Sequence, residues 1–184
     1  MNDSVTPQQI IDFWFSPEVS PHWFDSRPEL DRLIQERFES LLMLAAEGRL
    51  EDWERSAQGA LGLCILLDQF PLNMYRGQPR SFETEQQAVA IAKRTVKAGQ
   101  DRELTDSQKA FLYMPLMHSE SPQDQELSVQ LYEAAGLREN ARFARHHRDL
   151  IRRFGRFPHR NAILGRESTE EELAYLSSPQ AFKG

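Results

Sequence analysis

The sequence has little cysteine, no long apolar run and no excess of positive charge. Its 184 residues include a single cysteine, Cys64, which excludes an intrachain disulfide and a cysteine-rich metal site. The longest apolar run, residues 60–67, would span about 12 Å as a helix, against roughly 30 Å for a bilayer core. We therefore expect a buried core helix there and no membrane span. The formal net charge of −6 argues against a general nucleic-acid binder.

The N-terminal residues and the chain length indicate where the protein resides and how it is organised. Residues 1–4 carry no basic region, and no apolar stretch follows them. We expect no signal peptide and a cytoplasmic location, which the single cysteine also fits. A chain of this length suits a single domain over residues 1–184, and such a domain buries roughly 70% of its unfolded surface.

Helical signals fill the sequence, whereas no segment alternates between apolar and polar residues for long enough to indicate a sheet. Capping motifs and first-turn prolines mark helix starts at residues 6–9, 26–29, 105–108, 121–124 and 168–171. Glycines at 48, 99, 136 and 155 mark helix ends. We predict an all-α fold of about seven to nine helices that pack as antiparallel neighbours.

Three of these helices have features that bear on a site. The helix over residues 56–69 is apolar on nearly every face, so we expect it at the centre of the fold, ending at Phe70-Pro71. Pro115 should break or kink the helix that begins near residue 105. A helix over residues 138–154 carries His147 on its apolar stripe, so His147 should face inward.

Three polar segments interrupt the helical pattern. The first, residues 67–77, reads LDQFPLNMYRG and begins inside the apolar helix. The second, residues 111–120, reads FLYMPLMHSE and is followed by Gln125. The third runs from Phe143 to Glu171 and contains RFGRFPHRN at 153–161 and LGREST at 164–169. None of the three reads as a simple helix or a simple turn.

The strings LDQFPLN, LYMPLMHSE and RFGRFPHRNAILGREST resemble those of the bacterial family known as domain of unknown function 924. The resemblance extends from Ile10 to near the C-terminus. It implies an all-α fold of tetratricopeptide-like helix pairs and no established activity. Leu72 stands where the family usually carries arginine, so a ligand contact through that arginine would be lost or supplied by Arg76 or Arg80.

The third segment is rich in arginine. Nine arginines, no lysine and two acids, Glu139 and Asp149, lie between residues 138 and 166, so this stretch carries +7 and the rest of the chain −13. Arginine stays charged when partly buried, and its planar fork binds a carboxylate or a phosphate through two contacts. The same forks also tie helices together through the protein's own carboxylates. The composition fits an anion site and a structural network equally well.

We expect the three segments to meet at a pocket for a small anionic ligand, a phosphate or a carboxylate. Arg156, Arg160 and Arg166 would bind the anion, and His118, His159 and Glu120 would orient it or transfer a proton. Hydrolysis fits such a pocket, but no nucleophile stands out, and we predict no metal site and identify no cofactor. The candidate ligand-binding residues are Asp68, Gln69, Arg76, His118, Glu120, Gln125, His147, Arg156, His159, Arg160, Asn161 and Arg166.

Two other interpretations stay open. A tetratricopeptide-like stack offers a concave groove, in which arginines would hold an acidic peptide of a protein partner. Alternatively, the arginines, histidines and carboxylates form a structural polar core without a small-molecule site. Histidines that hydrogen-bond inside a core fit this last interpretation as well as they fit catalysis.

Overall fold

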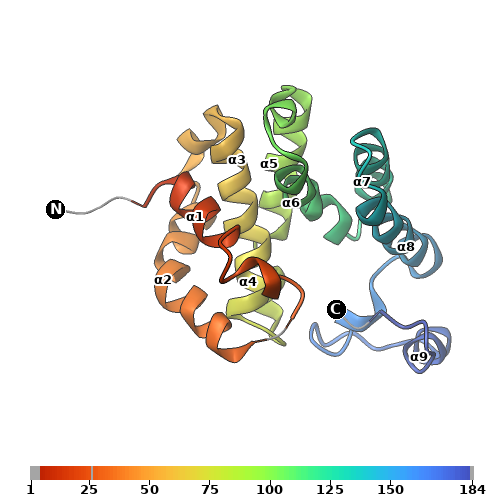
Figure 1. The fold of residues 1–184 in the computed structure, drawn as a ribbon. Coiled ribbons are helices and arrows are strands. Elements are labelled where there is room, and N and C mark those ends of the chain that lie inside the picture. The colour runs from red at the N-terminus through yellow and green to blue at the C-terminus, as the bar shows by residue number, and fades with distance from the viewer. Residues whose placement is uncertain (1–4, 26, 183–184) are drawn as a thin grey trace. The chain divides into compact units, whose positions relative to one another are not determined.

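The computed structural model describes residues 5–25 and 27–182 and is all-α across them, with no strand, as the sequence predicts (Figure 1). Short 3-10 turns join several of the helices. None of these helices combines the length and the apolar character that crossing a bilayer requires. The helices are α1 (Pro7–Trp14), α2 (Pro28–Ala46), α3 (Ala57–Cys64), α4 (Phe70–Met74), α5 (Glu85–Lys97), α6 (Asp106–His118), α7 (Pro122–Ala134), α8 (Arg138–Phe154) and α9 (Glu170–Leu176).

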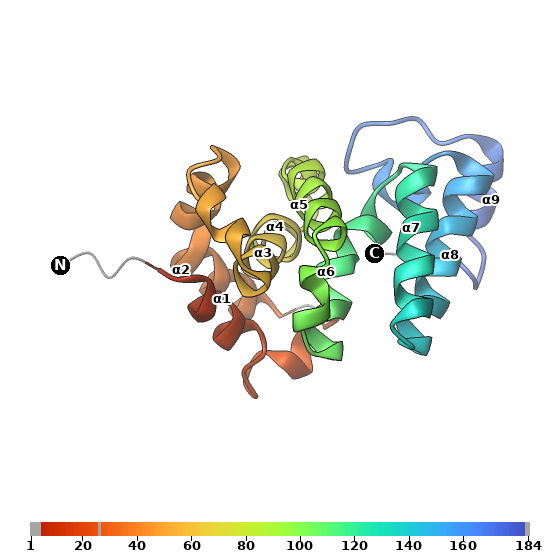
Figure 2. The same ribbon diagram turned by 90° about the horizontal axis from the view of Figure 1, so that it is seen from above.

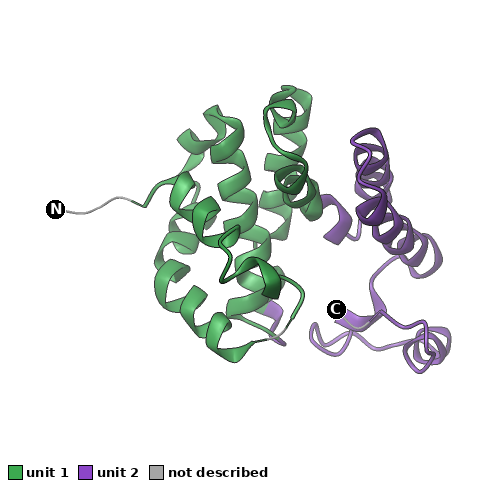
Figure 3. Cartoon of the chain, in the orientation of Figure 1, with its two compact units in different colours: residues 1–76, 80–115 green, residues 77–79, 116–184 purple. Residues whose placement is uncertain are grey.

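The chain divides into two compact units (Figure 3). The first unit comprises residues 1–76 and 80–115, and the second comprises residues 77–79 and 116–184. Helix α6 contributes to both, because the boundary falls after Pro115. The single-domain organisation expected from the chain length stays a prediction.

The first unit is built around α3 and the segment that follows it. Helices α1 and α5 pack against α3, and α2 packs against α4. Leu61, Cys64 and Ile65 are fully buried, so the apolar run is a core helix, as predicted. Edge-to-face aromatic contacts from Phe13 and Trp14 to Phe70 fix α1 on this core.

The central helix does not end at Phe70-Pro71, so that prediction was wrong. The chain widens into one π-helical turn, Ile65–Gln69, and continues as α4 through Pro71. Proline lacks the N–H that a helical residue donates back along the chain. The Leu67 carbonyl, the usual acceptor for position 71, instead accepts a hydrogen bond from Thr84 Oγ1 at 2.5 Å. A side chain from outside the helix thus replaces the missing donor.

Pro115 does not break its helix either. Helix α6 passes through Pro115 and ends at His118. Of the two outcomes expected at Pro115, a break or a kink, the break is therefore wrong. The chain leaves the helical conformation only after the helix, at residues 119–121.

The second unit contains a helical hairpin followed by a loop and a short helix. Helices α7 and α8 lie side by side (Figure 2), and the short connection at residues 135–137 makes them antiparallel. Gly155, with φ 72°, ends α8 as expected. A 3-10 turn, Pro158–Arg160, follows, and the chain then reaches α9. Leu150, Ile151, Phe157 and Tyr175 form a buried core here.

The helix starts agree with the capping motifs except at two places. Thr6 and Gln9 form the expected capping box of α1. The last helix begins one residue later than predicted, because Thr169 is its N-cap and Glu172 completes its capping box. Ser26, the expected cap of α2, lies outside the described residues, and Arg27 occupies the N-cap position.

Candidate functional site

Nine of the twelve candidate residues belong to the second unit. They come from the end of α6, the turn before α7, α7 and α8 themselves, and the loop after Gly155. The end of the second polar segment, residues 116–120, and the third segment therefore belong to one unit. Asp68, Gln69 and Arg76 belong to the first unit, and their convergence with the others stays a prediction. The nine are His118, Glu120, Gln125, His147, Arg156, His159, Arg160, Asn161 and Arg166.

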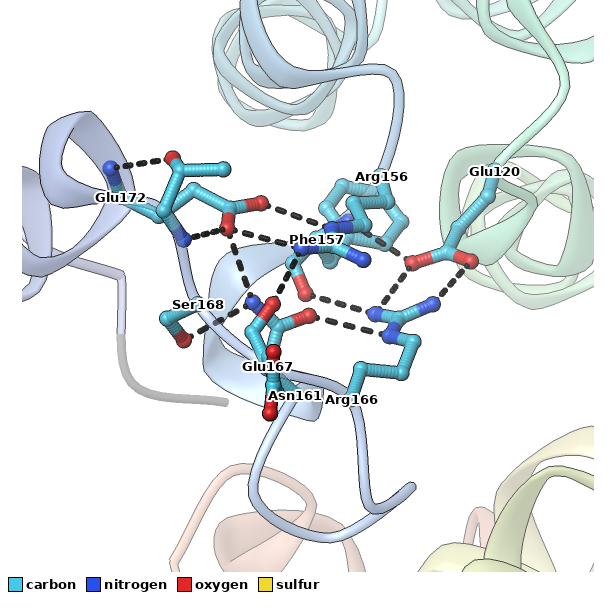
Figure 4. A network of polar contacts seen from close by, with 9 residues as sticks. Glu120, Arg156, Phe157, Asn161, Arg166, Glu167, Ser168 and Glu172 are labelled. Atoms are coloured by element: carbon cyan, nitrogen blue, oxygen red, sulfur yellow. Dashed lines mark hydrogen bonds and ion pairs between the residues drawn. The ribbon is translucent and has the colours of Figure 1, made fainter.

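One ion pair ties the loop after α8 to the turn before α7. Arg166 donates to both carboxylate oxygens of Glu120, at 2.8 and 2.9 Å (Figure 4). Glu120 also accepts from the Phe157 backbone N–H at 2.7 Å, and Arg166 donates to the Phe157 carbonyl at 3.0 Å. Arg166 Nε donates to Asn161 Oδ1 at 2.9 Å. The fork of Arg166 is therefore used by the protein's own acceptors.

A second ion pair ties the same loop to α9. Arg156 Nε and Nη2 donate to the two carboxylate oxygens of Glu172 at 2.8 and 2.9 Å, and Nη2 also donates to the Glu167 carbonyl (Figure 4). Glu172 is 2% exposed and also accepts from Asn161 and from the Thr169 backbone N–H. Asn161 thus bridges the two pairs, since its oxygen contacts Arg166 and its nitrogen contacts Glu172.

The carboxylates of both pairs stay ionised under physiological conditions. Burial raises the pKa of Glu120, but the hydrogen bonds from Arg166 and the Phe157 N–H outweigh burial and lower it below its usual value. The hydrogen bond from Arg156 lowers the pKa of Glu172 to about 2 against the opposing effect of burial. We call these two pairs the loop clamps, because together they fix residues 155–169 between α7 and α9.

The arginines of α8 also contact the protein's own acids. Arg145 pairs with Glu133 of α7 at 2.6 Å, and Arg148 and Arg152 both pair with Glu126. Arg153 pairs with Glu171 of α9 at 2.7 Å. The arginine-rich face of α8 is therefore matched by carboxylates on its neighbours, which fits the structural alternative for these residues.

Buried polar contacts shape the turn before α7. Gln125, fully buried, donates from Nε2 to the carbonyls of Met117 and Ser119, both at 2.7 Å. Ser119 Oγ donates to Asp124 Oδ2 at 2.7 Å. Gln125 therefore positions the turn. Sequence reasoning missed Ser119 and Asp124 as part of this turn, because a pair five residues apart does not have the i, i+3 spacing of a capping box.

A histidine cluster lies beside the loop clamps. We define it as His118, His147 and His159 with Arg160. His147 is 4% exposed, and its Nδ1 lies 2.9 Å from the Phe143 carbonyl, so Nδ1 carries the proton in the neutral ring. The ring of Phe157 contacts His147 at 5.5 Å and His159 at 5.6 Å between centroids. The inward orientation predicted for His147 is confirmed.

Arg160 is the most buried arginine of the loop, at 6% exposure. Its Nη2 donates to the His118 carbonyl at 2.8 Å, and its guanidinium carbon lies 4.9 Å from the centre of the Phe157 ring. This contact joins the end of α6 to the 3-10 turn at 158–160. Arg160 thereby holds a positive charge within the histidine cluster.

Burial and neighbouring charges keep His147 and His159 neutral by lowering the pKa of each ring. Burial lowers the pKa of His147 to about 3, with His118, His146 and His159 adding to the effect. Burial also lowers the pKa of His159 to about 4, assisted by Arg160, His118 and Arg166 against the opposing effect of Glu120. Within the described part of the chain, the buried Nδ1 of His159 has no hydrogen-bond partner.

The C-terminal segment supplies a residue that the sequence did not indicate. The ring of Phe182 lies 4.7 Å from that of His147 and 5.0 Å from that of His159. Phe182 follows a short polar stretch after α9, and an isolated phenylalanine there gave no periodic signal. Only the folded path of the chain brings it to the cluster.

The candidate residues of the first unit have local partners. Gln69 donates from Nε2 to Asp68 Oδ2 at 2.6 Å and contacts Met114 Sδ at 3.2 Å, both inside the core. Arg76 makes a two-point contact with Asp31 of α2 at 2.8 and 2.9 Å. Arg76 therefore anchors the end of α4 to α2.

Across residues 5–25 and 27–182, no group of three or more histidine, cysteine, aspartate or glutamate side chains has an arrangement suited to a metal ion. The histidine cluster is accordingly a set of imidazoles and one guanidinium. Its chemistry is hydrogen bonding, charge stabilisation and proton transfer.

Comparisons with known proteins identify relatives without assigning an activity. A family model described as bacterial protein of unknown function (DUF924) matches residues 10–180. This chain is similar to a solved structure of a protein of unknown function, ATU0120 from Agrobacterium tumefaciens, with 36% sequence identity and a TM-score of 0.86. The match covers 93% of this chain and 96% of the Agrobacterium chain. No curated protein matches the sequence. The resemblance expected from the three sequence strings is confirmed.

Proposed function

This chain belongs to the DUF924 family of bacterial proteins of unknown function, and we propose that it binds a small anionic molecule, a carboxylate or a phosphate, at the histidine cluster of its second unit. The observation that carries the proposal is the Nδ1 of His159, which is buried without a hydrogen-bond partner among the described residues. A buried polar atom without a partner costs free energy. A ligand oxygen would supply that partner.

The charges around His159 favour an anion over a cation or a neutral guest. Burial lowers the pKa of His159 most, and Arg160, His118 and Arg166 lower it further against the opposing effect of Glu120, so these three groups oppose a positive charge at this point. The electrostatic potential that repels a proton from the ring attracts an anion to it. Binding of the anion would in turn favour the protonated ring, whose N–H would then donate to the ligand.

The loop clamps supply the scaffold for this site. Arg156 and Arg166 each contact a carboxylate at two points and a backbone carbonyl besides. Releasing either fork for a ligand would leave a partly buried carboxylate without its partner. We therefore assign ligand contact to Arg160, His118, His147 and His159, and positioning to Glu120, Asn161, Arg156, Arg166 and Gln125.

Binding has more support than hydrolysis. A histidine with a pKa near 4 is a weak base. Ser119, the nearest hydroxyl in sequence to His118, is fully buried and donates to Asp124. The acidic-peptide alternative has less support still, because the arginines of the α7–α8 hairpin are matched by Glu126 and Glu133. The tetratricopeptide-like character of this hairpin stays a prediction.

Thermal unfolding with added anions tests the proposal. A ligand at 100 times its Kd stabilises the folded state by about 2.7 kcal/mol, so inorganic phosphate or acetate should raise the Tm. Arg160→Gln and His159→Gln should abolish the increase. Arg153→Gln is the matched control, because Arg153 pairs with the exposed Glu171 outside the cluster, and it should respond as the wild type does. Equal increases in all four proteins would show that the anions act elsewhere.

A further inference from the structure

The ring of Phe182 occupies a position enclosed by imidazoles. It makes edge-to-face contacts with His147 and His159, and it lies 6.4 Å from the ring of His146. Three histidines from two elements therefore meet one phenyl ring. Such contacts are more specific in geometry than simple apolar packing, because the ring edge of one partner points at the face of the other.

A hydrogen bond to Tyr175 and a short turn hold Phe182 in place. Its backbone N–H donates to the Tyr175 hydroxyl at 2.8 Å. The Ala181 N–H donates to the Ser178 carbonyl at 3.1 Å. The segment over residues 179–182 follows the last turn of α9 and is not helical. A segment with few backbone hydrogen bonds to the described residues is expected to open locally at lower free-energy cost than the helices do.

We propose that Phe182 is a built-in plug of the histidine cluster, and that a ligand with an aromatic ring beside its carboxylate displaces it. This inference rests on the proposed function, since it names the class of anion that the cluster accepts. The ligand's ring would take the place of the Phe182 ring against His147 and His159. Its carboxylate would reach the Nδ1 of the His159 ring, which has no hydrogen-bond partner among the described residues, beside the charge of Arg160.

The alternative role for Phe182 is that of an ordinary core residue. It packs beside Leu150, Ile151, Phe157 and Tyr175 together with Phe154 and Leu176. Phe154 offers a matched control, because it packs on the same core and contacts Tyr175 at 5.3 Å between ring centroids. A core role predicts equal consequences of removing either ring. The plug role predicts that removing the Phe182 ring increases the solvent access of His147 and His159, and that removing the Phe154 ring does not.

Hydrogen exchange at the imidazole C2 position measures the plug without any ligand. In Phe182→Ala, exchange at His147 and His159 should accelerate about tenfold or more, as expected when a local closed state is lost. Tyr175→Phe, which removes only the hydroxyl tether, should give a smaller acceleration in the same direction. Phe154→Ala should exchange as the wild type does, and circular dichroism should confirm that each variant is folded. Unchanged exchange in folded Phe182→Ala and Tyr175→Phe, or equal acceleration in Phe154→Ala, would overturn the plug.

Binding of benzoate, acetate and inorganic phosphate tests the ligand class by calorimetry. Benzoate should bind Phe182→Ala about tenfold more tightly than the wild type, because the plug no longer competes for the ring position. Acetate and phosphate lack a ring, so the substitution should increase their affinity less than it increases the affinity of benzoate. Equal gains for all three would overturn the aromatic class. Failure of every anion to bind either protein would refute the proposed function, whereas the exchange rates would still decide whether Phe182 closes the cluster.

Discussion

At the scale of single residues, two glutamates determine how the arginine-rich loop is held. Glu120 accepts hydrogen bonds from Arg166 at both carboxylate oxygens and from the Phe157 N–H. Glu172 receives donors from Arg156, Asn161 and Thr169. A carboxylate that accepts from several donors leaves some of them without a good acceptor when it is neutralised. The loop should therefore depend on these two acids more than on any exposed pair of α8.

Glu120→Gln tests this dependence. The amide keeps the shape of the side chain but removes the charge and one acceptor oxygen, so we expect a loss of about 1–3 kcal/mol of unfolding free energy. Urea denaturation measures it. Glu126→Gln is the control, because Glu126 also serves two arginines but is 40% exposed, and exposed pairs contribute less than about 1 kcal/mol. If both variants lose the same unfolding free energy, the Glu120–Arg166 pair stabilises the fold no more than an exposed ion pair does.

The sequence predicted residue types better than residue partners. The arginine strings and the inward face of His147 followed from local spacing alone. The partner of Arg166 lies 46 positions earlier in the chain, and that of Arg156 lies 16 positions later, so no periodicity could indicate them. The same holds for Phe182, whose contact with His147 depends on the path of the chain after α9.

At the scale of elements, capping signals and glycines predicted most helix boundaries. Arg138–Phe154 and the first helix agree with expectation. The larger errors fall at prolines, where local rules assume that the segment itself must supply the missing hydrogen bond. At Pro71 a threonine from another element supplies it. Such compensation depends on tertiary structure and cannot be read from neighbouring residues.

Thr84→Val tests the explanation for the uninterrupted central helix. Valine keeps the shape but removes the donor to the Leu67 carbonyl, leaving a buried acceptor unsatisfied at a cost of about 1–3 kcal/mol. Thr95→Val is the control. Thr95 is 2% exposed, but its hydroxyl donates to Ile91, an ordinary carbonyl four residues earlier in α5, so its loss should cost less. A smaller loss of unfolding free energy in Thr84→Val than in Thr95→Val would contradict the view that Thr84 replaces the missing donor.

At the scale of the whole molecule, buried neutral histidines couple stability to pH. Burial lowers the pKa of His147 to about 3 and of His159 to about 4, whereas an unfolded histidine titrates near pH 6.5. The unfolded chain therefore binds more protons than the folded one between these values. Stability from the neutral histidines is complete above about pH 6.5 and is lost as pH falls toward 4.

The unfolding free energy should accordingly fall between about pH 6.5 and pH 4.5, by up to about 1.4 kcal/mol per pH unit for each proton taken up. Glu172, with a pKa of about 2, also loses its stabilising contribution as pH falls, but only below about pH 4.5, so the interval between pH 6.5 and pH 4.5 reports on the histidines. His159→Gln should flatten the dependence in urea titrations. A wild type whose stability is constant between pH 7 and pH 5 would contradict the buried neutral state.

The titration of the His159 imidazole, followed by NMR with and without inorganic phosphate, tests the central claim most directly. The account predicts a pKa near 4 in the free protein and a rise of about one unit or more when phosphate binds beside the ring. Arg160→Gln should remove the rise. A His159 that titrates at the same pH with and without saturating phosphate would contradict an anion site at the histidine cluster.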